Sequence, residues 1–188
     1  MRDAEFSSPH LEGDVESRSA QMAAHEVVLT RLDPDGETAV RLLASYYGEL
    51  DERFPEGFDL EVALRASASD LMPPSGVFYG LAVAAVWSGC GAVRRLDDET
   101  WEVKSMWIAP TIRGRGAGRL LLETLEAFAG SHGGRSIRLD TSRHLPEAIA
   151  LYLRAGYTEC APYNDNVFAD FWFEKRLVPL ALDRRFDL

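Results

Sequence analysis

The residues that point most directly to chemistry are the arginines and glycines of 113–119, Arg-Gly-Arg-Gly-Ala-Gly-Arg. They follow an alternating apolar segment and precede an amphipathic one, which predicts a strand, a loop and a helix in that order. A helix that begins near Gly116 leaves backbone N–H groups without partners at the positive end of its dipole. Such a terminus binds anions, most often a phosphate, and arginines can clamp its oxygens.

Two common phosphate-binding patterns do not fit these residues. A Walker loop requires a Gly-Lys pair, which the sequence lacks. A dinucleotide fingerprint that begins at Gly114 and Gly116 requires a third glycine at position 119, where the chain has Arg119. An ATP- or NAD-dependent enzyme is therefore disfavoured.

The pattern that does match is Arg/Gln-x-x-Gly-x-Gly/Ala, at Arg113, Gly116 and Gly118. With it the chain resembles the GNAT superfamily of N-acetyltransferases. The segment 103–110, VKSMWIAP, is similar to the family's fourth strand and its exit, and 148–157, AIALYLRAGY, to its late helix and following strand. One family feature is absent, because Leu145 stands where an asparagine often contacts coenzyme A.

The resemblance implies acetyl-CoA as cosubstrate and no metal. The loop would hold the pyrophosphate of CoA, which falls on Arg113, Gly114, Arg115, Gly116, Ala117, Gly118 and Arg119. The fourth strand would pair with the pantetheine arm through the main chain at Met106, Trp107 and Ile108. Tyr152 would lie near the thioester sulfur, where its hydroxyl can donate a proton to the leaving thiolate.

A base is also expected, because an alkyl ammonium must lose a proton before it can attack a thioester. At pH 7 that step costs about 4.6 kcal/mol for a pKa near ~10.4. A carboxylate can offset the cost, and we predict Glu102 in this role, with an ordinary exposed strand residue as the alternative. Simple alternation along 100–108 places Trp101, Val103, Ser105 and Trp107 on one face, and Glu102, Lys104, Met106 and Ile108 on the other.

The expected activity is transfer of an acetyl group from acetyl-CoA to a primary amine by direct attack. The acceptor stays open between a small amine or aminoglycoside, a polyamine, an amino acid and a peptide or protein N-terminus. Residues 52–58 and 164–166 are two segments that could border its pocket, although a plain helix-to-loop turn is the favoured interpretation of 52–58. A hypothesis from another class is a non-catalytic acyl-CoA-binding or sensing module on the same fold. The resemblance is also compatible with a homodimer.

Composition bounds the remaining possibilities. The chain has 188 residues, 46% of them hydrophobic, which predicts one globular domain at 25–188 after a flexible leader at 1–24. A net charge of −10 argues against nucleic-acid binding. The sequence has neither a signal-peptide pattern nor a 20-residue apolar run, so a cytoplasmic protein without a membrane partner is expected.

The patterns predict an α/β (α+β) fold: a mixed, mostly antiparallel sheet flanked by helices, with a splayed central strand pair implied by the resemblance. The predicted strands are 26–32, 77–86, 87–93, 100–108, 136–140, 157–159 and 168–177. The predicted helices are 37–53, 59–68, 116–129 and 146–154.

Overall fold

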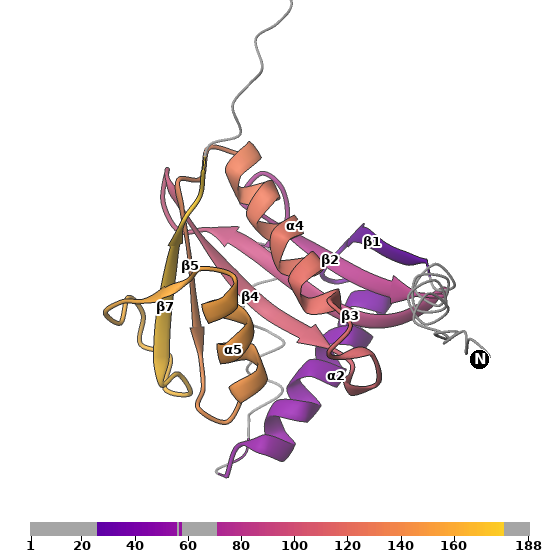
Figure 1. The fold of residues 1–188 in the computed structure, drawn as a ribbon. Coiled ribbons are helices and arrows are strands. Elements are labelled where there is room, and N and C mark those ends of the chain that lie inside the picture. The colour runs from indigo at the N-terminus through magenta and orange to yellow at the C-terminus, as the bar shows by residue number, and fades with distance from the viewer. Residues whose placement is uncertain (1–25, 56, 58–70, 179–188) are drawn as a thin grey trace, which may run out of the picture.

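The computed structural model describes residues 26–55, 57 and 71–178. The predicted leader at 1–24 and the predicted helix at 59–68 lie outside these residues. Within them, one seven-stranded sheet has the order β1-β2-β3-β4-β5-β7-β6 (Figure 1). Neighbouring strands are antiparallel except for the parallel pair β4 and β5. The predicted fold class is confirmed.

The first half of the described chain supplies four strands and a long helix. They are β1 (Val27–Leu32), α2 (Glu37–Arg53), β2 (Gly76–Val83), β3 (Val86–Arg95) and β4 (Thr100–Ile108). The predicted position of the β2–β3 turn, after Val86, is wrong. The chain turns at Ala84 and Ala85, whose φ values of 49° and 64° give the left-handed two-residue turn that matches strand twist.

The second half supplies η2 (Pro110–Ile112), α4 (Ala117–Ser131), β5 (Ser136–Thr141), α5 (Pro146–Arg154), β6 (Thr158–Glu159) and β7 (Phe171–Arg176). Helix α5 has the predicted bounds. It begins at a proline, which suits a first helical position, and Gly156 follows its end with φ 89°. The predicted last strand began three residues too early, because Phe168 belongs to the loop before β7.

Two apolar cores lie on opposite faces of the sheet. Helices α4 and α5 cover one face and α2 covers the other (Figure 1). On the first face, Leu121 and Leu125 of α4 are fully buried against Trp101, which confirms the helical stripe expected from their spacing. On the second face, Leu42 of α2 packs with Phe78.

A β-bulge in β4 overturns the alternation predicted for this strand. Two residues, Ser105 and Met106, stand opposite Gly91 of β3, and Ser105 has a φ of 50°. The extra residue reverses the side-chain alternation beyond it. Met106 and Ile108 therefore pack on the same core as Trp101 and Val103, and Trp107 packs on the core of α2. Glu102 and Lys104 do not share a face with Met106 and Ile108.

The strands β4 and β5 are paired only at their beginnings. The pairs run from Thr100 with Ser136 to Glu102 with Arg138, and beyond them β4 continues alongside β3 alone. In Figure 1 the two arrows visibly diverge. This is the predicted splayed pair, and it opens the sheet between the α2 face and the α4–α5 face.

Candidate functional site

The loop before α4 presents a row of open backbone donors. Gly114 and Gly116 have φ values of 75° and 86°, a region that glycine adopts without strain. Gly116 is the N-cap of α4 and carries no side chain to cap it. No residue of the described chain accepts a hydrogen bond from the N–H groups of 114–119. These donors and the helix dipole together suit an anionic ligand.

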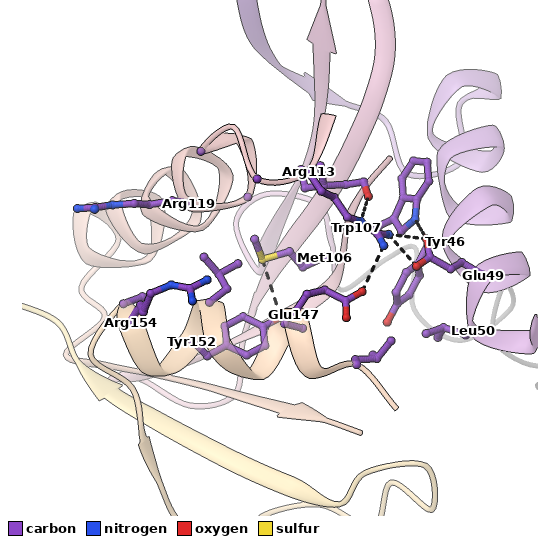
Figure 2. A pocket seen from close by; sticks show the side chains of 18 residues that line it. Tyr46, Glu49, Leu50, Met106, Trp107, Arg113, Arg119, Glu147, Tyr152 and Arg154 are labelled. Carbon is purple, nitrogen blue, oxygen red and sulfur yellow. Dashed lines mark hydrogen bonds and ion pairs between the residues drawn. The ribbon is translucent and has the colours of Figure 1, made fainter. Parts of the chain in front are cut away.

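A cavity of about 460 Å³ opens beside this loop (Figure 2). Nine predicted site residues line it: Met106, Trp107, Ile108, Arg113, Gly114, Gly116, Gly118, Arg119 and Tyr152. Three others do not: Arg115 is exposed outside the cavity wall, Ala117 is buried in the core, and Glu102 is fully buried outside the cavity. The remaining wall comes from α2, from α5 and from the two residues that cap α5, through Tyr46, Glu49, Leu50, Leu145, Glu147, Ala148, Leu151, Arg154 and Ala155.

Two arginines stand at one end of this cavity. Arg119 and Arg154 lie on the same side in Figure 2, away from Glu49 and Arg113. Arg119 pairs with Glu123 at 2.7 Å, one turn along α4, and both side chains are exposed. Arg154 was not predicted as a site residue, because a basic residue in the last turn of a helix is ordinarily explained by the helix dipole. Both place positive charge near the open amides.

The side chain of Arg113 turns away from the loop. Its Nε donates to the Ile108 carbonyl oxygen at 2.8 Å, and its Nη2 contacts the two Glu49 carboxylate oxygens at 2.7 and 2.6 Å (Figure 2). Its Nη1 donates to Glu147 of α5 at 3.2 Å. Arg113 therefore connects α2, the exit of β4 and the start of α5, which positions the cavity walls.

Glu49 is the centre of that network. It also accepts from Trp107 Nε1 at 2.7 Å and pairs with Arg53 at 2.7 Å. Burial opposes ionisation of its carboxyl, but the hydrogen bonds from Arg113 and Trp107 and the charges of both arginines outweigh burial. The pKa of Glu49 therefore lies below its ordinary value.

A second cavity, of about 350 Å³, lies next to the first. Its wall includes Tyr47, Phe54, Arg94, Val103, Lys104, Ser105, Asp140, Thr141, Ser142, Asn166 and Phe168. Six further residues line both cavities: Tyr46, Leu50, Met106, Leu145, Ala148 and Tyr152. The two spaces therefore meet beside Met106 and Tyr152, where β4 has parted from β5.

Tyr152 lies at this junction. Its side chain is buried, and its hydroxyl lies 3.9 Å from the Met106 sulfur (Figure 2). Burial, assisted by the charge of Asp140, raises the pKa of Tyr152 above its ordinary value. The phenol is therefore fully protonated at neutral pH.

The two carboxylates near the second cavity differ in accessibility. Glu102 is fully buried, and its oxygens accept from Arg94 at 2.7 Å and Tyr163 at 3.0 Å, while it lines neither cavity. Asp140 lines the second cavity with a side chain 8% exposed. The base role of Glu102 stays a prediction, while Asp140 is a carboxylate that faces the cavity.

Asp140 and its neighbours were missed by sequence reasoning. Asp140 ends the predicted strand 136–140, Lys104 lies within the predicted strand 100–108, and Arg94 is 46 positions from Asp140 in the chain, so no spacing connects them. The segments 52–58 and 164–166, for which the sequence left an acceptor role open, line the second cavity through Phe54 and Asn166.

The described residues contain neither a metal-binding cluster nor a membrane-spanning helix. No group of three or more His, Cys, Asp or Glu side chains in 26–55, 57 and 71–178 is arranged to hold a metal ion. No helix in the same part of the chain is long and apolar enough to cross a membrane.

Known proteins share both this sequence pattern and this fold. The profile of the Acetyltransferase (GNAT) family matches residues 38–157. An IAA acetyltransferase of Azospirillum brasilense is 30% identical over 140 residues, 73% of this chain and 88% of that protein.

Solved structures agree with the sequence matches. A Klebsiella pneumoniae protein assigned as an acyl-CoA N-acyltransferase is 29% identical with a TM-score of 0.64, over 81% of this chain and 98% of its own. The PaiA N-acetyltransferase of Thermoplasma acidophilum, solved with coenzyme A, has a TM-score of 0.63 at 17% identity, over 80% and 99%. Because the matched residues contain the glycine loop, the splayed strands and the helix of Tyr152, the chain belongs to the GNAT family and is an acyltransferase.

Proposed function

We propose that the protein transfers an acetyl group from acetyl-CoA to an amine. The observation that carries the proposal is the junction of two cavities at Tyr152, one of them beginning at the open amides of 114–119. Two adjoining spaces suit a donor and an acceptor that must meet at one reacting atom. A protein of the same fold, the Thermoplasma N-acetyltransferase, is solved with coenzyme A.

The residues of the first cavity fit coenzyme A. The amides of 114–119, with Arg119 and Arg154 beside them, would hold the pyrophosphate. The arm would follow β4 beyond Glu102, where the strand has no β5 partner. Gly118 borders this path. A Cβ at this position would lie 3.4 Å from Leu151 and 3.7 Å from Ile108, so the lack of a side chain keeps the path open.

Leu145 stands where relatives often have an asparagine. It lines both cavities, so an apolar side chain covers the junction instead of an amide. We propose that the open amides of the loop and the two arginines supply the polar contacts of the donor, and that Leu145 excludes water from the thioester.

The reaction would run as follows at these atoms. The acceptor ammonium gives one proton to Asp140, and the neutral nitrogen forms a bond to the thioester carbonyl carbon. The carbon–sulfur bond breaks, and the thiolate takes a proton from the Tyr152 hydroxyl. The nitrogen loses its second proton, which restores Tyr152, while Asp140 releases the first, so one proton leaves per turnover.

Glu102 is better placed to support this arrangement than to take the proton. Its buried carboxylate accepts hydrogen bonds from Arg94, which lines the second cavity, and from Tyr163 and Asn164. The last two belong to the loop that contributes Asn166 and Phe168 to the cavity wall. We expect Asp140→Asn to reduce kcat/KM at low pH more than Glu102→Gln does. A larger loss in the Glu102 variant, with its melting temperature unchanged, would restore Glu102 as the base.

Two measurements test the proposal. Acetyl-CoA should raise the melting temperature, because a ligand bound to the folded state alone stabilises it by about 2.7 kcal/mol at 100 times its Kd. A panel of amines should release CoA thiol from acetyl-CoA. Absence of any thermal shift at millimolar acetyl-CoA contradicts the proposal, and a shift without thiol release from any amine indicates a binding module instead.

A further inference from the structure

The second cavity has a charge pattern unlike the chain as a whole. Its wall carries the cations Arg94 and Lys104 and the anion Asp140, in a protein of net charge −10. Arg94 belongs to β3, Lys104 to β4 and Asp140 to β5, so three strands contribute charge to one space. A ligand of this cavity meets both signs of charge.

Lys104 is held only loosely by its anionic neighbours. Its Nζ lies 3.4 Å from Asp140 Oδ2 and 3.7 Å from Glu102 Oε1, longer than the 2.7–2.9 Å usual for charge-assisted hydrogen bonds. An ammonium has three donors, so Lys104 retains capacity for a ligand. Asp140 is held more closely, by the amides of Asn164 at 2.8 Å and Asn166 at 2.7 Å.

A ligand that covers these groups must replace the water that now reaches them. The Lys104 side chain is 30% exposed and Asp140 is 8% exposed. Burying either charge without a polar partner costs free energy, so an acceptor that is apolar apart from its amine is disfavoured. Arg94 and Lys104 are balanced by Glu102 and Asp140, so these four groups carry no net negative charge that would favour a ligand with several positive charges.

Aromatic side chains also line this cavity. The rings of Phe54 and Phe168 stack with centroids 5.8 Å apart and an interplanar angle of 13°, and both line the cavity with Tyr47. The wall therefore offers an apolar surface for a substituent of the acceptor.

Resting on the proposed transfer to an amine, we infer that the acceptor also carries a carboxylate, as an α-amino acid with an apolar or aromatic side chain does. The carboxylate faces Lys104 and Arg94, whose guanidinium also contacts Glu102. The amino group faces Asp140, and the substituent lies against Phe54 and Phe168. Polyamines and aminoglycosides are expected to be poorer acceptors, because Asp140 is the one anionic side chain among the described residues that line this cavity.

The experiment measures thiol release with phenylalanine, phenylalaninamide, phenethylamine and spermidine. Its readout is the ratio of kcat/KM for phenylalanine to kcat/KM for phenylalaninamide, since the two acceptors differ in the carboxylate. Lys104→Gln should lower this ratio by about 10- to 100-fold relative to the unmodified protein, the effect of losing a charged hydrogen bond. Lys175→Gln is the matched control, because Lys175 pairs with Glu126 on the opposite face and is similarly exposed at 25%; it should leave the ratio unchanged.

The outcomes separate the inference from the proposed function. Faster acetylation of spermidine or phenethylamine than of phenylalanine, or an unchanged ratio in Lys104→Gln, overturns the acceptor class and leaves the transferase intact. A thermal shift with acetyl-CoA but no reaction with any amine overturns the transferase and the inference together. If Lys104→Gln does not fold, the ranking of kcat/KM among the four acceptors in the unmodified protein tests the acceptor class.

Discussion

The two cavities that meet at Tyr152 are built from different parts of the chain. The first begins at a continuous loop, 114–119, and uses backbone N–H groups that glycines leave accessible. The second is assembled from charged and aromatic side chains of β3, β4, β5, α2 and the loop before β7. The first cavity therefore depends largely on main-chain geometry, whereas the second depends on which side chains the fold brings together.

This difference explains how each cavity can vary. A backbone site tolerates exchange of most side chains, provided that the glycines and the helix start are kept, so a shared donor can be bound by distant relatives. A side-chain site changes with single substitutions, so acceptors can differ between proteins that share 30% identity or less. We therefore expect substitutions in the two cavities to alter different kinetic constants.

The largest effect is expected at Tyr152, which belongs to both cavities. Tyr152→Phe removes the hydroxyl that we assign to the leaving thiolate, and kcat should fall by about 10²- to 10³-fold. The thermal shift with acetyl-CoA should persist, because the loop amides are untouched. Because burial and Asp140 raise the pKa of Tyr152, the unmodified enzyme should show no loss of kcat from this group up to about pH 10. Unchanged kcat in the variant would remove Tyr152 from the chemistry.

The next largest effect tests whether the backbone alone makes the donor site. Gly116→Val places a side chain at φ 86°, at the start of α4, and should weaken acetyl-CoA binding by about 10-fold or more through a displaced loop. Gly133 is the matched control, because it has φ 88° and is equally open, but lies beyond the far end of α4. Gly133→Val should lower the melting temperature similarly and leave the acetyl-CoA affinity unchanged. Equal loss of affinity in both variants would attribute the effect to strain rather than to the site.

The difference between a site made by the main chain and a site made by side chains also explains which features could be predicted from the sequence. The loop, α4 and α5 follow from local signals: glycine positions, an apolar stripe at Leu121 and Leu125, and a proline at the start of α5. These features depend on neighbours in the chain, and their elements agree with the prediction within two residues. The residues predicted to contact the donor therefore line the first cavity, apart from the exposed Arg115 and the buried Ala117, and their contact with the donor stays a prediction.

Features set by tertiary structure were not predicted. The bulge at Ser105 depends on the fit of β4 against β3, and without it the alternation placed Met106 on the wrong face. The turn at Ala84 contains no glycine or asparagine to mark it. Asp140, Arg94 and Lys104 meet because three strands are adjacent, which no local pattern reports.

A smaller effect is expected in the side-chain network around Glu49, which supports the first cavity. Glu49→Gln removes the charge that holds Arg113 and Arg53, and should lower the melting temperature by a few degrees at neutral pH. The pKa of Glu49 is lowered in the fold, so its stabilisation is present above the ordinary carboxyl pKa and is lost as pH falls through the lowered value.

The difference between the unmodified protein and Glu49→Gln should therefore shrink as the pH falls below about 4.3, the ordinary value for a glutamate. Glu123→Gln is the control, since its partner Arg119 and Glu123 itself are mostly exposed, and melting should change little at any pH. A difference for Glu49→Gln that is constant from pH 7 to pH 3 would show that its carboxylate charge does not stabilise the fold.

The smallest effect is expected at Gly118, where one substitution should raise the stability of the fold and weaken acetyl-CoA binding. Gly118 lies in the first turn of α4, and a Cβ there would meet Leu151 at 3.4 Å, an ordinary contact distance. Gly118→Ala should stabilise the fold, by up to about 1 kcal/mol, because alanine favours a helix over glycine. The same methyl group narrows the cavity beside Ile108, so the KM for acetyl-CoA should rise a few-fold while the KM for the acceptor stays constant. A higher melting temperature with both KM values unchanged would mean that the donor does not pass Gly118, and the backbone site would then end at Gly116.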